Sequence, residues 1–465
     1  MEPARKDGMI AQFKAGPLNR ALSNLRIAWQ NIAGAAYDET AASLRPDLPE
    51  DDVVRLREQM AACLGVRGGE VSARARAAAL GRAYLALDAT GRKRFLRVLA
   101  KDFGIDRDAV DQAMEVVRGA DEGDPRRHAE NALRRALEPP RLRLLTQFNA
   151  LPEGVKFLVD MRAELLPLSR RDPALRALED DLKALLTTWF DVDFLELRRI
   201  TWDSSPAALL EKLIAYEAVH PIESWDDLKN RLDSDRRWYA YFHPSMPSEP
   251  LIFVEVALVR GMAGNVNLLL DETAPVLDPK EADTAIFYSI SNAQKGLAGI
   301  SFGNFLIKRV VDALTGEFPQ ITTFATLSPV PGFRAWLDKR LEEGHDEQLA
   351  AFADLLADPA WPHDADRAGQ VRGPLMGLCA RYLAQEKRSD GRRARDPVAH
   401  FHLTNGARME RLNWLGDTSS KGLEQAHGMM INYQYKLGDI DDNSDHYVTD
   451  GRVAMSSAFK AHLRG

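Results

Sequence analysis

The chain has 465 residues, more than one hydrophobic core ordinarily serves, so two domains, or three, are expected. Apolar residues make up 45% and charged residues 28%, the balance of a folded globular protein and not of a disordered one. The formal net charge is −7, so the chain lacks the basic excess typical of nucleic-acid-binding proteins. No run of about 18 uncharged apolar residues occurs, which argues against a transmembrane helix.

The two cysteines, Cys63 and Cys379, are too few for a disulfide framework or a thiolate zinc site. Both have apolar neighbours, so we expect packed thiols in a reducing compartment. Residues 1–14 mix both signs of charge and lack the apolar core of a secretory signal. The sequence therefore predicts a cytoplasmic protein.

Residues 1–190 have the periodicity of helices. Apolar residues recur every three or four positions behind Pro17, at Leu18, Leu22, Leu25, Trp29 and Ile32, and again from Leu175 to Trp189. The stretches 74–103 and 131–166 are rich in Ala, Leu, Arg and Glu. We expect residues 1–190 to form an all-α domain, a helical bundle or hairpin array, that packs against the rest of the chain and mediates self-association.

Past residue 190 the pattern changes to that of strands. Runs that predict strands lie at 251–259, 285–290, 321–327, 401–403 and 429–437. A helix is predicted at 302–314, between the second and third of these runs. Strand, glycine-rich turn, helix and strand in succession form a βαβ unit, so part of the sheet should be parallel. We expect an α/β domain over residues 191–465.

The turn from Gln294 to Asn304 joins the strand predicted at 285–290 to this helix, and it holds Gly296, Gly299 and Gly303. Such a turn can direct several backbone N–H groups to one point at the positive end of a helix, as a pyrophosphate requires. It has neither the ending of a nucleotide P-loop nor the dinucleotide-binding spacing. The pyrophosphate of an acyl-CoA is the candidate ligand, and close packing of the glycines is the alternative.

Ser328 stands in Thr326-Leu-Ser-Pro-Val-Pro-Gly-Phe333, at the end of a predicted strand. The following proline keeps Ser328 out of helical geometry, and a Pro-Gly pair then predicts a turn. Ser328 should lie at the carboxyl end of a strand, where open α/β sheets usually bind ligands. A plain turn with the hydroxyl bonded to the backbone is the simpler interpretation. The sequence has no Gly-x-Ser-x-Gly elbow, so a hydrolase nucleophile is not indicated.

Two histidines and two tyrosines follow. Strand alternation predicts that His400 and His402 share one face, where they could ligate a metal. No third ligand is evident nearby, so a single catalytic or structural histidine is favoured, and His402 could donate a proton near neutral pH. Tyr433 and Tyr435 should also share a face, with a core strand as the simpler interpretation. The basic run 387–395 is typical of a solvated loop, or it receives a nucleotide 3′-phosphate.

These motifs together resemble those of the malonyl-CoA decarboxylase family. The matching segments occur in the family's order over most of residues 190–465. They are Phe242-His-Pro-Ser-Met-Pro-Ser-Glu-Pro-Leu251, Ala285-Ile-Phe-Tyr-Ser-Ile-Ser291, Gly303-Asn-Phe-Leu-Ile-Lys308, Leu327-Ser-Pro-Val-Pro-Gly-Phe333, Phe401-His-Leu-Thr-Asn-Gly-Ala407 and Asn432-Tyr-Gln-Tyr435. The helical half resembles the family's N-terminal domain more loosely.

The resemblance implies a helical N-terminal domain followed by a mixed-sheet catalytic domain with the acetyltransferase-like (GNAT) fold. It implies that a homo-oligomer, tetramer or dimer, converts malonyl-CoA to acetyl-CoA and carbon dioxide without a metal or an organic cofactor. The family's motifs place the catalytic serine, histidine and tyrosine on Ser328, His402 and Tyr435. The implied acyl-CoA-binding residues are Ala298, Gly299, Ile300, Ser301, Phe302, Gly303, Asn304 and Ile307.

Two loop residues depart from the family's pattern. Ala298 stands where the family has Gln, and Ser301 where it has Glu, so backbone N–H groups are the expected donors of this loop. The expected mechanism passes through a thioester enolate, stabilised by hydrogen-bond donors, that His402 protonates with the help of Tyr435. Two other functions stay open: a GNAT-type acyl-CoA-dependent acyltransferase, and a non-catalytic regulator that binds malonyl-CoA.

Overall fold

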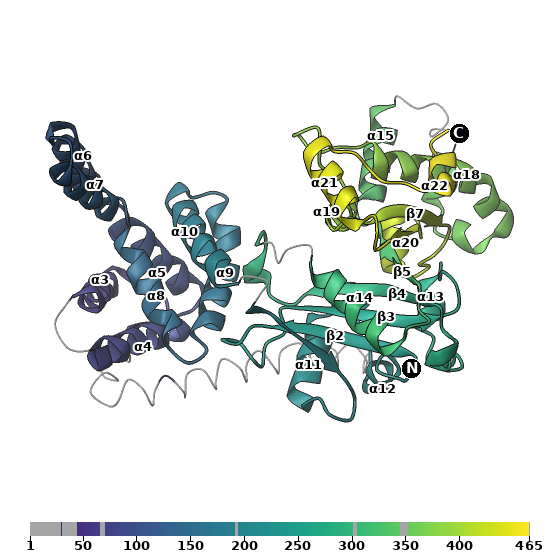
Figure 1. Ribbon diagram of the computed structural model, residues 1–465, viewed down its shortest axis with the longest axis horizontal. Helices are drawn as coiled ribbons and strands as arrows, with labels where there is room; N and C mark the ends of the chain where they lie inside the picture. The colour runs from purple at the N-terminus through teal and green to yellow at the C-terminus, as the bar shows by residue number, and fades with distance from the viewer. Residues whose placement is uncertain are drawn as a thin grey trace.

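The computed structural model describes Trp29 and residues 44–65, 70–190, 194–300, 305–344 and 352–464. A helical region precedes a mixed-sheet domain (Figure 1), which confirms the predicted fold class. The helices of the first region are α3 (Glu50–Leu64), α4 (Glu70–Ala86), α5 (Ala89–Asp102), α6 (Arg107–Gly119), α7 (Asp124–Ala136), α8 (Pro140–Asn149), α9 (Gly154–Ser169) and α10 (Pro173–Trp189).

Helix α10 shows why this region is helical. Asp172 accepts the N–H of Ala174 and so caps the helix, and Pro173 occupies its first turn, where no hydrogen bond is lost. Its apolar stripe is buried, at Leu175, Leu178, Leu182 and Leu186. Each buried leucine contributes about 1.5–3 kcal/mol, which outweighs the intrinsic helix propensity of any one residue.

The helix predicted from Leu18 to Ile32 lies outside the described residues, with one exception. Trp29 is helical and fully buried, and its Nε1 donates to the carbonyl oxygen of Pro152 at 2.7 Å. The ring of Trp29 also packs edge-on against Phe157 of α9, with centroids 4.8 Å apart. Trp29 itself therefore packs against the α8–α9 connection and α9.

The sheet consists of β1 (Glu196–Ile200), β2 (Arg236–Phe242), β3 (Ile252–Val259), β4 (Thr284–Asn292), β5 (Thr323–Thr326), β6 (Ser328–Pro329), β7 (Arg408–Asn413) and β8 (Met430–Gln434). Strands β1 to β4 pair antiparallel in chain order. Strand β8 pairs antiparallel with β5, β6 and β7. Only β4 and β5 among the described strands pair in parallel, and α14 (Phe305–Glu317) connects them, so the predicted βαβ unit is confirmed.

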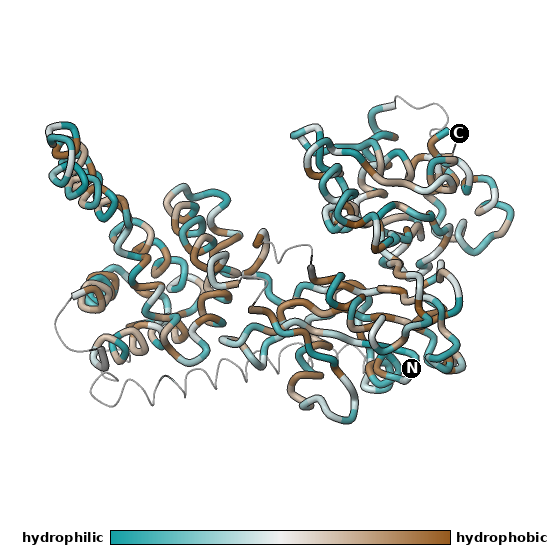
Figure 2. Tube along the Cα trace, viewed as in Figure 1, coloured by the Kyte–Doolittle hydropathy of each residue, from teal (hydrophilic) through white to brown (hydrophobic). Residues whose placement is uncertain are grey.

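Helices cover both faces of the sheet (Figure 1). On one face, α14 contributes Leu306 and Val310 to a core with Val254 and Phe287. On the other face lie α11 (Ala207–Tyr216), α12 (Trp225–Asn230) and α13 (Val266–Leu269). Figure 2 shows the hydrophobic residues that run along the strands between these layers.

The remaining helices gather around β6, β7 and β8 at the carboxyl-terminal end of the domain (Figure 1). They are α15 (Phe333–Glu343), α17 (Ala353–Ala357), α18 (Ala365–Ala384), α19 (Pro397–Thr404), α20 (Ser420–Ala426), α21 (Ile440–Asp450) and α22 (Ser457–Ala461). Within the described ranges, no helix combines the length and the apolar character needed to cross a bilayer.

The strand predicted at 401–403 is wrong, because these residues belong to helix α19. Asp396 caps this helix by accepting the N–H groups of Val398 and Ala399, and Pro397 occupies its first turn. A short apolar run does not distinguish a strand from a buried helix, whereas the Asp-Pro start is a helix signal. On a helix, two residues two positions apart point about 200° apart, so His400 and His402 do not share a face.

Candidate active site

The turn after Ser328 is joined to helix α19 by close packing. A Cβ added to Gly332 would lie 2.2 Å from the hydroxyl oxygen of Tyr382, so any other residue here would force Tyr382 to shift. Tyr382 in turn donates to Asp396, the capping residue of α19, at 3.4 Å. The same packing that forms the Pro-Gly turn therefore sets the position of the helix that carries His402.

Ser328, His402 and Tyr435 come together in the interior. The Oγ of Ser328 lies 3.1 Å from Nε2 of His402, and Nδ1 of His402 lies 2.8 Å from the Tyr435 hydroxyl. The Tyr433 ring stacks on the imidazole, with centroids 4.5 Å apart and planes inclined by 25°. Both tyrosines thus contact His402, Tyr433 from β8 and Tyr435 from the residue that follows it, consistent with the predicted shared face. The simpler interpretation of Ser328, a hydroxyl bonded to the backbone, does not hold.

Burial decides the protonation of this group. All three side chains are at most 5% exposed. Burial lowers the pKa of His402 to about 3, because the charged imidazolium loses its hydration. Burial raises the pKa of Tyr435 well above its usual value for the same reason. At neutral pH, His402 is therefore a neutral imidazole with one N–H and one lone pair, and Tyr435 keeps its proton.

A cavity of about 220 Å³ opens onto Ser328 and His402. Its wall combines apolar side chains with the polar Tyr288 and Asn292 of β4, and it includes Phe287, Ile290, Val398 and Phe401. The pairing of β4 with β5 ends at Phe287 and Thr326. Beyond a register shift at Tyr288, residues 289–292 pair with β3 alone among the described strands. The other backbone edge of β4 is thus open to an extended ligand beside the cavity.

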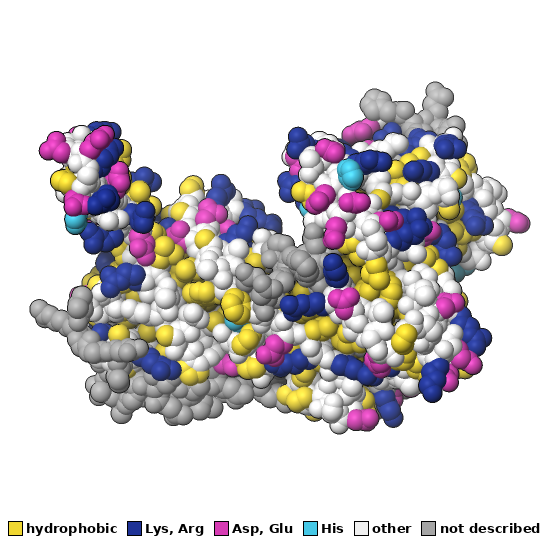
Figure 3. Space-filling view, viewed as in Figure 1, with side chains coloured by type: hydrophobic (Ala, Val, Ile, Leu, Met, Phe, Trp, Pro, Cys, Tyr) yellow, Lys and Arg dark blue, Asp and Glu magenta, His cyan; other side chains and the backbone are white. Residues whose placement is uncertain are grey.

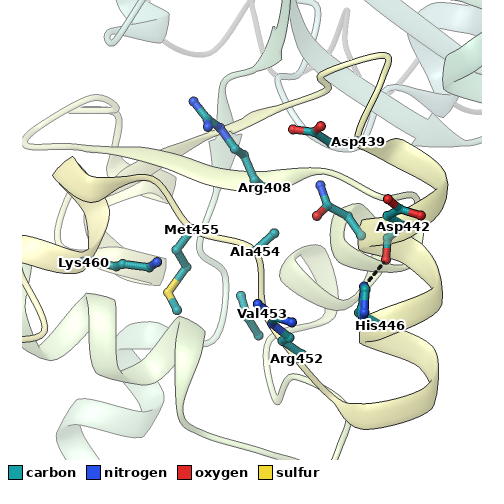
Figure 4. A pocket seen from close by; sticks show the side chains of 10 residues that line it. Arg408, Asp439, Asp442, His446, Arg452, Val453, Ala454, Met455 and Lys460 are labelled. Atoms are coloured by element: carbon teal, nitrogen blue, oxygen red, sulfur yellow. Dashed lines mark hydrogen bonds between the residues drawn. The ribbon is translucent and has the colours of Figure 1, made fainter.

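A larger cavity of about 650 Å³ lies elsewhere, among β7, α21 and the segment that follows it (Figure 4). It contains charged side chains of both signs, among them Arg408, Asp442, Arg452 and Lys460. None of the residues predicted for the site lines it. Cavity size therefore does not identify the reactive centre, whereas the buried contact of serine with histidine does.

The glycine-rich turn is described up to residue 300, and the predicted site residues Ser301, Phe302, Gly303 and Asn304 lie outside the described residues. The N–H of Ala298 donates to the carbonyl of Lys295, and the N–H of Ile300 to that of Leu297. These two donors are therefore engaged within the turn. Gly299 has φ +74°, a left-handed conformation that favours glycine. Ile307 lies on α14 and is buried in the core.

Close packing accounts for Gly296. A Cβ there would lie 1.7 Å from the carbonyl oxygen of Val159 in α9. Arg162, one turn further along α9, donates to the carbonyl oxygens of Gly296 at 2.5 Å and Ala298 at 2.9 Å, while Glu179 of α10 pairs with the same guanidinium at 2.7 Å. The helical region thus supports the turn through contacts from α9.

Lys183 of α10 reaches the same turn. Its Nζ lies 3.6 Å from the position that a Cβ would occupy on Gly299. The described residues provide no carboxylate within ion-pair distance of this ammonium group. Sequence reasoning missed both Arg162 and Lys183. The turn residues that they contact lie more than a hundred positions away along the chain, and no local motif marks either residue.

The other candidates from the sequence lie apart from this centre. Nδ1 of His400 lies 2.9 Å from the hydroxyl of Tyr447, on the side of α19 away from Ser328. No group of three His, Cys, Asp or Glu residues in the described ranges is placed to hold a metal ion. The basic run 387–395 forms a short hairpin in which Arg393 pairs with Asp390 and Arg395 with Glu386. Cys63 and Cys379 are free and buried, as expected of packed thiols.

Comparison with known proteins gives consistent matches over both regions. The family model described as the malonyl-CoA decarboxylase C-terminal domain matches residues 193–465, and that of the N-terminal domain matches residues 103–190. The mitochondrial malonyl-CoA decarboxylase of Mus musculus is 36% identical, over 95% of this chain and 92% of its own length. That of Anser anser anser is 37% identical over 82% of each chain. The crystal structure of malonyl-CoA decarboxylase from Rhodopseudomonas palustris superimposes with a TM-score of 0.83 at 44% identity, covering 88% of this chain and 99% of that one.

Proposed function

The chain belongs to the malonyl-CoA decarboxylase family, and on this premise we propose that Ser328, His402 and Tyr435 carry out the conversion of malonyl-CoA to acetyl-CoA and carbon dioxide. The chain is thus a carboxy-lyase. One observation carries the assignment of residues: Ser328 Oγ, the His402 ring and the Tyr435 hydroxyl form one hydrogen-bonded row that ends at a cavity.

Malonyl-CoA carries its own electron sink, the thioester carbonyl β to the carboxylate. Breaking the bond to the carboxyl carbon releases carbon dioxide and leaves the electron pair on the α-carbon, delocalised onto the thioester oxygen. One proton must then reach that carbon to give acetyl-CoA. The protein must therefore bind the malonyl group, provide hydrogen-bond donors for the enolate oxygen and supply a proton.

Binding of the CoA part rests on the glycine-rich turn and its neighbours. Lys183 places an ammonium group beside Gly299, where it would meet a phosphate. Arg162 occupies the carbonyl oxygens of Gly296 and Ala298, so these negative dipoles do not face an anionic ligand. The open edge of β4 at residues 289–292 would receive the pantetheine amides and lead the acyl group to the cavity beside His402.

The reaction itself takes place in the cavity beside His402, whose wall is largely apolar. Ser328 and His402 hold the malonyl group, with the imidazole N–H as the donor to the oxyanion and Ser328 holding the ring in place at 3.1 Å. Removing such a donor from an oxyanion typically costs about 10²–10³ in rate. His402 delivers the proton to the α-carbon, and the Tyr435 hydroxyl, at 2.8 Å from Nδ1, resupplies the ring. The apolar Ile290, Val398 and Phe401 keep bulk water from the carbanion.

Purified protein with malonyl-CoA alone, followed by mass spectrometry of the products, tests this function. Acetyl-CoA and carbon dioxide in equal amounts are expected without any acceptor. A GNAT-type acyltransferase would consume acyl-CoA only when an amine is added, and a regulator would return malonyl-CoA unchanged. Substituting Ser328→Ala then tests the site: a circular dichroism spectrum like that of the parent with a rate at least 10²-fold lower is expected, and an unaltered rate would remove Ser328 from the mechanism.

We propose further that the protein self-associates through the helical region. Helices α6 and α7 project from the rest of that region (Figure 1) and carry side chains of both charge signs (Figure 3). Val116 and Leu137 are 59% and 48% exposed there, an apolar exposure that a second chain would cover. Light scattering on the full chain, compared with Val116→Glu, tests this, since a monomeric parent would end the proposal.

We propose the cytoplasm as the compartment, supported by the two free thiols and testable by cell fractionation.

A further inference from the structure

We infer that Thr326 is a positioning residue that sets the direction of the proton chain at the active site. Thr326 accepts a hydrogen bond from the Ser328 hydroxyl and so favours the tautomer of His402 that carries its hydrogen on Nε2. The inference deepens the proposed function and rests on the roles given there to Ser328 and His402.

The position of Thr326 is determined by two strands. It is the last residue of β5, fully buried, and its backbone carbonyl accepts from Asn432 Nδ2 of β8 at 2.7 Å. Its Oγ1 accepts the backbone N–H of Tyr433 at 3.2 Å and the hydroxyl of Ser328 at 2.8 Å. The geometry at this last contact allows only Ser328 as the donor. The threonine hydroxyl is therefore held from the strand side as an acceptor for Ser328.

This contact decides what Ser328 offers to His402. A serine hydroxyl has a single proton, and here it is directed at Thr326. Towards His402 at 3.1 Å, Ser328 can only accept, so Nε2 of the neutral ring must be the nitrogen that carries the hydrogen. Nδ1 then presents its lone pair to the hydroxyl of Tyr435 at 2.8 Å. The four groups donate in one direction, from Tyr435 through His402 and Ser328 to Thr326.

The reverse direction is disfavoured by burial. If Ser328 donated to Nε2, Nδ1 would carry the hydrogen and donate to Tyr435, whose own proton would need another acceptor. The described residues offer Tyr435 no hydrogen-bond acceptor besides His402. The hydroxyl of Tyr435 is buried, so the reversed chain would leave a donor unsatisfied as well as breaking the contact with Thr326.

The direction of the chain separates this site from a Ser–His hydrolase pair. In a hydrolase, the histidine takes the serine proton and so creates a nucleophile. Here Ser328 receives a hydrogen bond from His402 and is not deprotonated by it. The proton on Nε2 is the one nearest the cavity, so it is the one transferred to the enolate carbon. At the same time, Nδ1 receives the proton of the Tyr435 hydroxyl. Solvent later supplies a proton to the resulting tyrosinate. Proton delivery is therefore favoured over formation of an acyl-serine.

Nuclear magnetic resonance of the ¹⁵N-labelled full chain without substrate tests this inference. Two-bond ¹H–¹⁵N correlations report which ring nitrogen carries the hydrogen, and the His402→Asn spectrum identifies the His402 signals. We expect hydrogen on Nε2 in the parent protein. Hydrogen on Nδ1 in the parent would overturn the inference at once, whatever the variants do.

Substitution of Thr326 tests its role. Thr326→Val keeps the shape but removes the acceptor, so we expect the His402 signals to shift toward the Nδ1-protonated form and kcat to fall about tenfold, with KM unchanged. Thr326→Ser keeps the acceptor and should retain the parent tautomer and kcat. If Thr326→Val does not fold, because Tyr433 also loses an acceptor, Thr326→Ala removes the same acceptor with a smaller side chain.

The readouts separate the two proposals. A parent tautomer in folded Thr326→Val or Thr326→Ala would overturn the role of Thr326 while leaving decarboxylation by Ser328 and His402 intact. Full turnover in His402→Asn would instead remove His402 from the proposed mechanism, although the resting tautomer of the parent would still be measurable. A merely structural role of Thr326 would lower the melting temperature without moving the tautomer.

Discussion

Arg162 and Ala298 join the helical region to the glycine-rich turn: Nη2 of Arg162 donates to the carbonyl oxygen of Ala298 at 2.9 Å. Arg162 is 1% exposed and also pairs with Glu179, so its removal leaves a nearly buried carboxylate without a partner. We expect Arg162→Met to lower the free energy of unfolding by about 3–5 kcal/mol. We also expect a higher KM for malonyl-CoA, since the turn loses its support.

Chemical unfolding and steady-state kinetics measure these two effects. Arg118→Met is the matched control, because Arg118 and Glu115 form an exposed pair within one helix, worth about 0.5 kcal/mol at most. Arg162→Lys keeps a charge beside Glu179 but cannot serve both carbonyl groups and the carboxylate, so it should raise KM with a smaller loss of stability. A parent-like KM in both Arg162 variants would contradict a role in supporting the turn.

Lys183 should bind the anionic part of the substrate. Its ammonium group lies beside Gly299 and is half-buried. We expect Lys183→Gln to raise KM about three- to tenfold, as for the loss of one charge-assisted hydrogen bond, with kcat unchanged. The dependence of KM on salt should weaken as well, because one ionic contact is gone. Lys101→Gln, an exposed lysine of α5, serves as the control. A fall in kcat with KM unaltered would argue against phosphate binding by Lys183.

His402 and His400 provide a matched pair on one helix. His402→Asn removes the proposed proton donor, so we expect kcat to fall by about 10²–10⁴-fold while the circular dichroism spectrum stays that of the parent. His400→Asn loses the contacts of Nδ1 with the Tyr447 hydroxyl at 2.9 Å and the Thr404 hydroxyl at 3.5 Å, and should keep kcat within about twofold. Equal losses in the two variants would indicate that α19 acts as a structural unit and that His402 has no chemical role.

Tyr433 on β8 and Tyr435 just after it differ by one hydroxyl contact. Tyr435→Phe removes the group 2.8 Å from His402 Nδ1, so we expect kcat to fall about tenfold and stability by about 1 kcal/mol. The Tyr433 hydroxyl is buried and has no hydrogen-bond partner among the described residues. Tyr433→Phe should therefore leave stability unchanged or raise it slightly, and keep the ring stacked on His402. Kinetics and thermal unfolding of both variants check this, and a larger loss in Tyr433→Phe would reverse the assignment.

Buried histidines make the protein sensitive to acid. Burial lowers the pKa of His402 to about 3 and that of His427 to about 4, from 6.5. In the unfolded chain each histidine takes up a proton below about pH 6.5, whereas in the folded protein it does not. Their contribution to stability is therefore complete above pH 6.5 and declines as the pH falls toward 4, by about 1.4 kcal/mol per unit for each histidine.

Urea unfolding at several pH values measures this decline. The difference in stability between the parent and His427→Gln should shrink by about 1.4 kcal/mol per pH unit between pH 6 and 4.5. At the active site, a neutral His402 predicts a kcat that does not titrate between about pH 6 and 8. A kinetic pKa near 6.5 that disappears in His402→Asn would show that the ring is charged during turnover and would contradict this prediction.

Much of the architecture followed from local patterns. The period of Leu175, Leu178 and Leu182 predicted α10, because a stripe of leucines must be buried against other helices. The β-rich run at 251–259 and the glycine turn before α14 predicted the βαβ unit, because a parallel connection needs a crossover helix. The motifs shared with a known family supplied Ser328, His402 and Tyr435 before their positions in space were known.

The sequence by itself therefore determined the order of the two regions, the location of most elements and the residues that we propose for the chemistry, since these depend on periods and motifs a few residues long. Only the tertiary structure decided that α19 is a helix, that His402 meets Ser328 across 74 positions, and that Thr326 accepts a hydrogen bond from Ser328. It also brought Arg162 to the turn 136 positions ahead. These contacts depend on how strands β5, β6 and β8 and helix α9 pack. Short-range patterns do not encode a direction of hydrogen bonding between residues that only the packed core brings together.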